Sequence, residues 1–213
     1  MKITFPLPAD GKTHSYCINC HAEPIKKVYK HGSEGFYCAA CGRTSTRYIH
    51  LALDDRNWID ETGELHHTTA GAVVRNMEGK YLFLERTEYP PGYNFPAGHV
   101  EAGEDALEAA GRELQEETGV KAGKLRHVVT AEVPVDSCSG GADTHEWHVY
   151  LEQLHQPAQV TLNDEHRHVV WLTLQEALGR KLPPAIRFLI EHYAVKIEQE
   201  AALHPSEDLA IQG

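Results

Sequence analysis

Apolar and polar positions along the chain predict strands that alternate with helices. Residues 69–75 and 81–85 are rich in strand-forming residues and flank the turn Asn76-Met77-Glu78-Gly79, which predicts a β-hairpin. Three later runs carry a similar strand signature, at residues 125–133, 145–154 and 168–172. This alternation predicts an α/β fold.

Two segments have the pattern of amphipathic helices. Residues 104–118 lack proline, are rich in Ala, Leu and Glu, and precede Gly119, which suits a helix C-cap. The second helix is predicted at residues 185–200, after Pro183-Pro184, with one apolar stripe formed by Ile186, Leu189, Ile190 and Tyr193. On the first helix, we expect the packed side to carry Leu107, Ala110, Gly111 and Leu114.

The other side of the first helix carries an acidic cluster. Glu113, Glu116 and Glu117 stand at offsets of zero, three and four, so their carboxylates share one face. Like charges at this spacing destabilise a helix, which indicates a cation held between them. Hard carboxylate oxygens suit Mg²⁺ or Mn²⁺, and either ion can bridge to a phosphate. A solvated acidic surface helix is the alternative.

The spacing around this cluster decides between the two interpretations. Five residues separate Gly98 from Glu104, seven more lead to the run Arg112-Glu113-Leu114-Gln115-Glu116-Glu117, and Gly119-Val120 follows. This arrangement resembles the signature of the Nudix hydrolases at every specified position. The resemblance covers roughly residues 68–193. It implies an α/β/α sandwich with a mixed sheet and the hydrolysis of a phosphoanhydride.

The resemblance also implies roles for individual residues. Mg²⁺ or Mn²⁺ ligands are implied at the Ala97 carbonyl, Glu104, Glu113, Glu116, Glu117 and Glu165, with Glu104 in an accessory position. Arg112 is implied to hold the carboxylates by charge-assisted hydrogen bonds. The catalytic base is either Glu113 or Glu165. Glu165 stands in a polar loop six residues ahead of Trp171, and an ordinary loop residue is the alternative there.

Two cysteine pairs near the start of the sequence predict a second, structural metal site. Seventeen residues separate the pairs, which are Cys17-x-x-Cys20 and Cys38-x-x-Cys41. This spacing is typical of a four-cysteine zinc ribbon. Two disulfides are the alternative, but residues 1–10 lack the apolar stretch of a secretory leader. His14 and His21 lie beside the first pair, although four cysteines already complete the zinc shell.

The remaining cysteine and the histidines have no recognisable metal-binding spacing. Cys138 lies in the run Ser137-Cys138-Ser139-Gly140-Gly141, and we expect it to be a bystander thiol. The 15 histidines are scattered, and we expect most of them to be surface or packing residues.

Composition excludes several classes of protein. The net charge of −11 provides no basic surface for general nucleic-acid binding. No apolar run approaches the roughly 20 residues of a membrane-spanning helix. We therefore expect a cytoplasmic protein with four segments: a leader and ribbon at 1–50, a polar linker at 51–65, a Nudix domain at 66–200 and a flexible tail at 201–213.

The expected substrate is a nucleoside diphosphate linked to another group. A ribbon ahead of a Nudix domain resembles the layout of the NADH pyrophosphatases, but their SQPWPFPxS-type run is absent from residues 120–160. Candidates are therefore ADP-ribose, a dinucleotide or an NADH-type compound. Four aromatic residues are candidates either for stacking on a base or for simple packing: Tyr89, Tyr93, Phe95 and Trp147.

A different class of function is also compatible with these motifs. The alternative is a non-catalytic nucleotide sensor, or an interaction module whose ribbon binds a partner. The intact carboxylates Glu113, Glu116 and Glu117 favour the enzyme. The resemblance also allows a homodimer.

Overall fold

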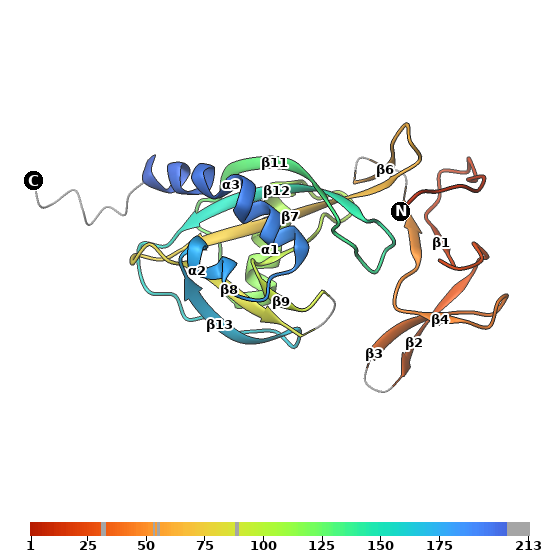
Figure 1. Cartoon of the computed structure of the whole chain (residues 1–213), viewed down its shortest axis with the longest axis horizontal. Helices are drawn as coiled ribbons and strands as arrows, with labels where there is room; N and C mark the ends of the chain where they lie inside the picture. The colour runs from red at the N-terminus through yellow and green to blue at the C-terminus, as the bar shows by residue number, and fades with distance from the viewer. Residues whose placement is uncertain (31–32, 53, 55, 88–89, 204–213) are drawn as a thin grey trace, which may run out of the picture. The chain divides into compact units, whose positions relative to one another are not determined.

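The computed structural model describes residues 1–30, 33–52, 54, 56–87 and 90–203 (Figure 1). Contacts divide the chain into two compact units. The first contains Met1–His67 and Pro134–His145, and the second contains Thr68–Val133 and Glu146–Gly213. The segment boundaries predicted at residues 50, 65 and 200 stay predictions. Within the described ranges, no helix has the length and hydropathy needed to span a membrane.

One large sheet organises the second unit. Its main path runs in the order β11-β12-β7-β8-β13. These strands are β7 (Leu65–Arg75), β8 (Tyr81–Arg86), β11 (Arg126–Pro134), β12 (Thr144–Gln153) and β13 (His166–Leu172). Two short strands, β9 (Gly92–Asn94) and β10 (Ala97–His99), pair with β8 and β7 respectively. The five predicted strands are thus present, and β9 and β10 are additional.

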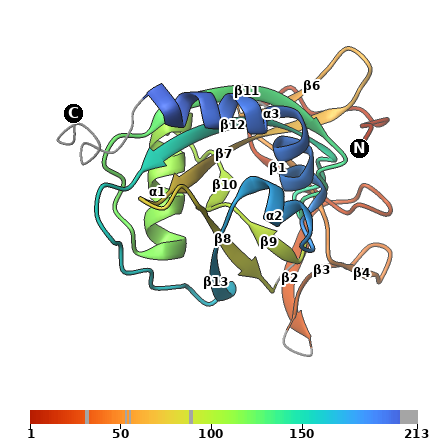
Figure 2. The same cartoon turned by 60° about the vertical axis from the view of Figure 1, so that its left-hand side comes forward.

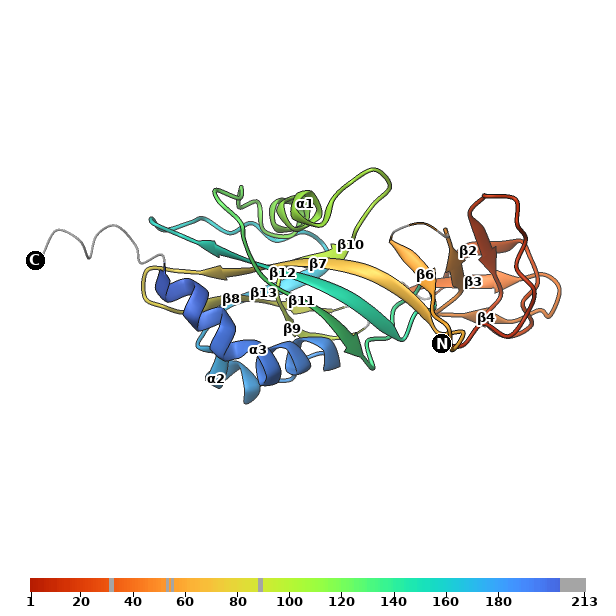
Figure 3. The same cartoon turned by 90° about the horizontal axis from the view of Figure 1, so that it is seen from above.

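Helices cover both faces of this sheet (Figure 3). Helix α1 (Ala106–Thr118) lies on one face, whereas α2 (Leu174–Leu178) and α3 (Pro184–Leu203) lie on the other. Alternate residues of a strand point to opposite faces, so the sheet can pack apolar side chains against the helices on both of its faces. On the α1 side, Ala72, Val74, Leu82 and Leu84 are buried in one cluster with Leu114. On the α3 side, Val73, Tyr81 and Phe83 are buried with Ile186 and Leu189. The α/β/α sandwich is confirmed.

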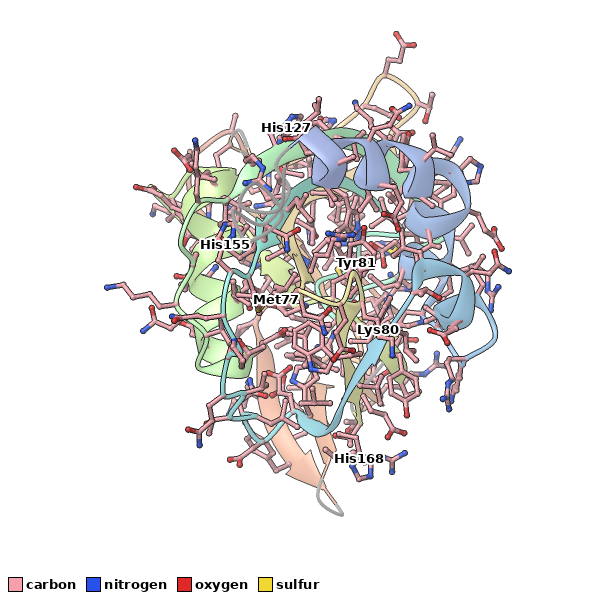
Figure 4. The ribbon with its side chains drawn as sticks, turned by 90° about the vertical axis from the view of Figure 1, so that its left-hand side faces the viewer. Met77, Lys80, Tyr81, His127, His155 and His168 are labelled. Carbon is pink, nitrogen blue, oxygen red and sulfur yellow. The ribbon has the colours of Figure 1, made fainter. Side chains whose placement is uncertain are left out.

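The predicted hairpin joins β7 to β8. The N–H of Asn76 donates to the carbonyl oxygen of Lys80 at 2.8 Å, and Arg75 pairs with Tyr81 across the turn. Gly79 has a φ of +78°, a backbone conformation that glycine adopts without steric cost. Figure 4 labels Met77, Lys80 and Tyr81 around this turn.

Helix α1 is fixed at both ends by its caps. Asp105 accepts a hydrogen bond from the N–H of Glu108, whose side chain accepts from the N–H of Asp105 in return. This capping box starts the helix at Ala106, two residues after the predicted position. Gly119 ends it in the left-handed conformation, as predicted, with a φ of 69°. Leu107, expected on the packed side, is 44% exposed, because Ala109 takes the buried position instead.

Helix α3 is longer than predicted, since it begins at Pro184 and reaches Leu203. Residues 201–203 of the predicted tail therefore belong to the helix, and residues 204–213 lie outside the described residues. The apolar stripe is confirmed, because Ile186, Leu189 and Ile190 are each 1% exposed.

The first unit has small sheets of its own (Figure 2). Strand β1 (His14–Tyr16) pairs with β5 (Ile49–Leu51). Strand β6 (Asn57–Ile59) instead belongs to the large sheet, in which it pairs with the first residues of β7. A three-stranded sheet contains β2 (Ile25–Lys30), β3 (Ser33–Cys38) and β4 (Thr44–Ser45). The unit also has a separate apolar core, made of Tyr16, Ile49, Leu51, Leu65 and Ala142.

Residues 134–145 belong to the first unit although they lie far from it in sequence. The N–H groups of Tyr48 and His50 donate to the carbonyl oxygens of Ser139 and Gly140, each at 2.9 Å. The guanidinium group of Arg47 donates to the carbonyl oxygens of Cys138 and Ala142, at 2.8 and 3.0 Å. Backbone and side-chain bonds therefore tie this segment to the strand that follows the cysteine pairs.

Candidate active site and cysteine cluster

An acidic cleft lies in the second unit beside the C-terminal half of α1. It brings together most of the predicted site residues with several others, and its lining comprises Arg86, Ala97, Gly98, His99, Glu101, Glu113, Glu116, Glu117, Asn163 and Glu165. Its volume is about 270 Å³. This lies just below the roughly 300–1,000 Å³ of pockets that enclose a whole ligand, so the cleft suits the phosphate part of a larger molecule.

The β10 backbone packs directly against the acidic face of α1. A Cβ atom at Gly98 would lie 2.0 Å from Oε1 of Glu113, so only glycine leaves room for this carboxylate. The N–H of Ala97 donates to Oε2 of Glu117 at 3.2 Å. The glycine that opens the signature is therefore explained by the close approach of backbone and carboxylate.

Burial disfavours the ionised form of both inner carboxylates. Glu117 is 5% exposed, and burial together with the charge of Glu113 raises its pKa to about 9, against the opposing effect of Arg86. Burial also raises the pKa of Glu113, although Arg112 opposes the change. A bound cation would reverse this situation, because it favours the charged carboxylates.

Arg112 connects the acidic residues of α1 and its entry loop. Its guanidinium group donates to both oxygens of Glu104, at 2.9 and 3.0 Å, and to Oε1 of Glu113 at 2.7 Å. Weaker contacts reach Glu116 at 3.4 Å and the His99 carbonyl at 3.1 Å. Glu104 does not line the cleft, since both its oxygens face Arg112. Its position is that of a group that orients Arg112.

Glu165 enters the cleft from the loop before β13. Its side chain is 45% exposed, and Nη2 of Arg86 lies 3.4 Å from its Oε2. The loop is held in place because Thr87 donates its N–H to the Glu165 carbonyl oxygen at 3.1 Å. The carboxylate is thus accessible, whereas its backbone is anchored to the end of β8.

Three polar residues of the cleft region carry no motif in the sequence, namely Arg86, Asn163 and His166. Oδ1 of Asn163 accepts from the N–H of Glu165 at 3.2 Å and lies 2.8 Å from Nδ1 of His166. Nε2 of His166 is buried 4.0 Å from Oε1 of Glu117, and burial lowers the pKa of His166 to about 4. Arg86 ends a strand and His166 begins one, so only the pairing of β8 with β13 brings them together.

The cleft carboxylates are spread out rather than gathered at one point. Among the described residues, no three carboxylates bring their oxygens within 4.8 Å of one another. Hard carboxylate oxygens on several sides of one cleft fit Mg²⁺ or Mn²⁺, which prefer oxygen ligands and share their coordination with phosphate and water. The donor set therefore fits a cation that binds together with a substrate.

The four aromatic residues considered for base stacking differ in how far they are buried. Phe95 is 1% exposed and packs against Phe83, with ring centroids 4.9 Å apart. Trp147 is 5% exposed and belongs to the same core cluster. These two rings are core residues, so of the two alternatives given for them, base stacking and simple packing, the structure supports packing. Tyr93 is partly buried with the Arg180 guanidinium 5.9 Å from its ring centroid, and Tyr89 lies outside the described residues.

The four cysteines of the first unit converge as the spacing predicts. All four Sγ atoms lie within 4.8 Å of one another. The Cys17–Cys41 and Cys20–Cys38 sulfur pairs are 3.7 and 3.6 Å apart. Sulfurs around a tetrahedral zinc with Zn–S bonds of about 2.3 Å are separated by about 3.8 Å. The cysteines are unlinked, and their geometry suits a zinc ion rather than the disulfide alternative.

Each cysteine pair lies on its own backbone turn, and the two turns have the same geometry. The N–H of His21 donates to the Cys17 carbonyl oxygen, and the N–H of Gly42 donates to that of Cys38, each at 2.9 Å. His21 and Gly42 also share a positive φ, of 59° and 70°. His21 stacks on Phe5, and His14 faces Asp10 and Glu23, so both histidines are engaged away from the cluster.

The model of the NUDIX domain matches residues 65–193, which is more than half of the chain. The chain belongs to the Nudix family. The matched range contains the cleft, the signature helix α1, the short helix α2 and the first half of α3.

Individual Nudix proteins resemble parts of this chain. Phosphatase NudJ of Escherichia coli K12 is 51% identical over 57 residues, which are 26% of this chain and 37% of that relative. The match thus spans about a third of the relative's length. A MutT protein from Methanosarcina mazei Go1 has 24% identity and a TM-score of 0.51, covering 62% of this chain and 94% of its own.

Two further solved structures share the fold. The Nudix hydrolase RenU of M. smegmatis has 19% identity and a TM-score of 0.53, covering 71% of this chain and 98% of its own. The NUDIX domain of Shewanella oneidensis NrtR, complexed with ADP ribose, has 18% identity and a TM-score of 0.52, covering 62% and 86%. At these identities the likeness establishes the Nudix fold.

Proposed function

We propose that this protein hydrolyses the phosphoanhydride of a nucleoside diphosphate linked to another group, using Mg²⁺ or Mn²⁺. The observation that carries this proposal is the pair of carboxylates formed by the buried Glu117 and the partly buried Glu113, which pack against β10 at a cleft that suits a phosphate group. Two adjacent buried carboxylates are costly unless a cation compensates them. Together with the backbone of Ala97 and the exposed Glu116, they would hold the ion.

The residues of the cleft divide the chemistry between them. A bound divalent cation supplies charge neutralisation for the diphosphate and lowers the pKa of the attacking water. Glu165 accepts a proton from that water while the water oxygen bonds to phosphorus. The bond from this phosphorus to the bridging oxygen breaks, and the bridging oxygen leaves with the other phosphate. We favour Glu165 over Glu113 because the side chain of Glu165 is 45% exposed, whereas Arg112 donates to Glu113 at 2.7 Å.

Among the described residues, Arg86 is the one arginine or lysine side chain that lines the cleft. A guanidinium group presents several donors to phosphate oxygens, so we assign Arg86 to contact the substrate phosphates and to position Glu165. Arg112 has a different task, because its donors are already occupied by Glu104 and Glu113. It holds the cation-binding carboxylates in place.

The cysteine cluster has a structural function in this proposal. Four thiolates in a closed shell leave no open position for water, so a zinc ion there would stabilise the ribbon without taking part in hydrolysis. Unlinked cysteines also suit a reducing compartment, and we therefore place the protein in the cytoplasm.

A substrate panel tests the proposed function. The purified protein is incubated with ADP-ribose, NADH, dinucleoside polyphosphates, nucleoside triphosphates and capped RNA, each with Mg²⁺ or Mn²⁺, and the released phosphates are identified. We expect cleavage between two phosphates of at least one diphosphate-linked compound. Binding of a nucleotide without turnover under all these conditions would contradict the proposed enzyme and favour the alternative, a non-catalytic nucleotide sensor.

A further inference from the structure

Three metal-binding side chains from different parts of the sequence meet in the first unit. His67 lies in β7, His145 lies in β12, and Cys138 belongs to the segment between β11 and β12. Their ligand atoms all lie within 4.8 Å of one another. His67 and His145 are 3% and 2% exposed, and their rings meet edge to face with centroids 5.7 Å apart. The site is separate from the four-cysteine cluster.

The distance between the thiol and the first histidine has the value that a zinc ion would require. Sγ of Cys138 lies 3.5 Å from Nδ1 of His67. Around a tetrahedral zinc, with bonds of about 2.3 Å to sulfur and about 2.05 Å to nitrogen, these two atoms are separated by about 3.6 Å. A hydrogen bond from the thiol to His67 would account for this pair alone. It would not account for the ring of His145, which meets the same two groups.

Each histidine is also oriented by an acceptor behind it. Nε2 of His67 donates to the carbonyl oxygen of His50 at 3.4 Å, which leaves Nδ1 facing the thiol. Nδ1 of His145 lies 3.3 Å from Oδ2 of Asp136, and we assign the other ring nitrogen, Nε2, as the ligand atom. Histidines that bind metals usually present their second ring nitrogen to a carboxylate or a backbone carbonyl in this way. Both kinds of partner are present here.

The backbone around Cys138 is shaped to bring the thiol to His67. A Cβ atom at Gly140 would lie 2.9 Å from Cε1 of His67, and one at Gly141 would lie 2.6 Å from the Tyr48 carbonyl oxygen. Gly141 also has a φ of +97°, which disfavours other residues. Arg47 fixes the Cys138 carbonyl oxygen at 2.8 Å. The segment is therefore held against β5 and β7 by close backbone contact.

We propose that His67, Cys138 and His145 form a second zinc site in the first unit. One thiolate and two imidazoles are ligands that zinc favours. The ion would fasten residues 134–145 to the start of β7. Cys138, expected from the sequence to be a bystander thiol, becomes a ligand in this proposal.

Zinc content of the full-length protein tests the proposal. After purification under reducing conditions, we expect about two zinc ions per wild-type chain, one in each cysteine-containing site, and about one in Cys138→Ser and in His145→Gln. His66→Gln is the matched control. His66 is 3% exposed in the same strand, but it faces Asp60 and stacks on Trp58, so this variant should keep both ions.

Asp136→Asn separates metal binding from folding. This substitution keeps the three ligands and weakens the support of His145, so zinc should dissociate about 10- to 100-fold more readily from one of the two sites. Titration of the metal-free wild type with Co²⁺ should show two sets of absorption bands, one from an all-sulfur site and one from a mixed nitrogen and sulfur site. Far-ultraviolet circular dichroism identifies any variant that has failed to fold.

Three results would overturn the second site. The first is one zinc ion per wild-type chain together with a single all-sulfur Co²⁺ spectrum. The second is a second zinc ion that persists unchanged in folded Cys138→Ser and His145→Gln proteins, which would indicate binding elsewhere on the surface. The third is equal zinc dissociation from wild-type and Asp136→Asn proteins.

Discussion

The acidic cleft and the four-cysteine cluster are both built to hold cations, but they differ in how their ligands are gathered. The four sulfurs lie within 4.8 Å of one another on two copies of the same backbone turn. No three described carboxylates are gathered so closely, and those of the cleft come from a helix and a loop. A closed thiolate shell suits a permanent structural ion, whereas an open carboxylate site suits an ion that shares its coordination with substrate.

The two regions also differ in how charge is balanced before a metal binds. In the cleft, Arg112 and Arg86 compensate the outer carboxylates, but Glu117 stays buried with a raised pKa of about 9. This residue is therefore the part of the cleft most in need of a cation. Substitution of this residue therefore tests most sharply whether the cleft, unlike the cysteine cluster, is a catalytic site.

The largest effect is expected for Glu117→Gln. The substitution keeps the shape of the side chain but removes a charged ligand, so turnover should fall about 100-fold or more while the fold persists. Steady-state rates on the best substrate of the panel measure the loss. Glu191→Gln is the control, since Glu191 is an exposed residue of α3 that pairs with Arg187 at 3.4 Å. Equal losses in both variants would contradict a specific role for Glu117.

A large effect on folding, rather than on turnover, is expected for Cys17→Ser. Losing one of four thiolates should release the ribbon zinc and unfold or mis-associate the first 50 or so residues, because metal binding and folding are coupled at such sites. Zinc analysis and limited proteolysis measure the change. Hydrolysis should remain measurable if the core of the Nudix domain folds independently. Retention of that zinc ion with a protease-resistant first unit would contradict the structural site.

A brief Mg²⁺ chelation extends the same comparison. Activity should disappear and return on addition of Mg²⁺, whereas zinc in the closed thiolate shell should remain bound. Activity that survives complete removal of Mg²⁺ and Mn²⁺ would break the proposed division between an exchangeable and a permanent ion.

An intermediate effect is expected for Glu165→Gln. If Glu165 accepts the proton of the attacking water, kcat should fall about 10²- to 10⁴-fold and the acidic limb of the pH–rate profile should change. Glu113→Gln, measured alongside, shows which carboxylate carries more of the proton transfer. Near-wild-type rates for Glu165→Gln across about pH 6 to 9 would remove Glu165 from the mechanism.

The smallest effects come from two glycine substitutions near α1. Gly98→Ala places a Cβ atom 2.0 Å from Oε1 of Glu113, so the carboxylate must move and activity should fall about 10-fold or more. Gly111→Ala is the control, since its nearest neighbour lies 3.7 Å away and alanine in a helix should stabilise the protein by about 0.5–1 kcal/mol. Thermal unfolding and rate measurements distinguish the two. Unchanged kinetics in Gly98→Ala would contradict the close approach.

The sequence predicts those parts of the molecule in which local spacing determines geometry. The two cysteines of each pair are close because they lie on one turn, and the acidic face follows from the helical period. Strand positions were predicted from short apolar runs, and the sandwich followed from the family resemblance. The start of α1 differs from the predicted one because the capping box of Asp105 and Glu108 decides where the helix begins.

Contacts between distant segments could not be predicted in this way. Arg86 and His166 meet only through the register of β8 with β13, and Cys138 reaches His67 only because residues 134–145 fold back on β5. Phe95 and Trp147 looked like possible base-stacking residues, since a sequence does not distinguish an exposed aromatic ring from a core one. Packing of the sheet against α3 places both in the core.

Mn²⁺ affinity as a function of pH tests the central claim most directly. In the metal-free protein the pKa of Glu117 is raised to about 9, so below that pH a cation must displace its proton. The wild-type affinity, measured by electron paramagnetic resonance, should therefore strengthen as the pH rises from about 6 to 9. Glu117→Gln should bind at least about 10-fold more weakly at the upper end and lose most of this pH dependence. Equal affinities with the same pH trend in both proteins would contradict the cation site.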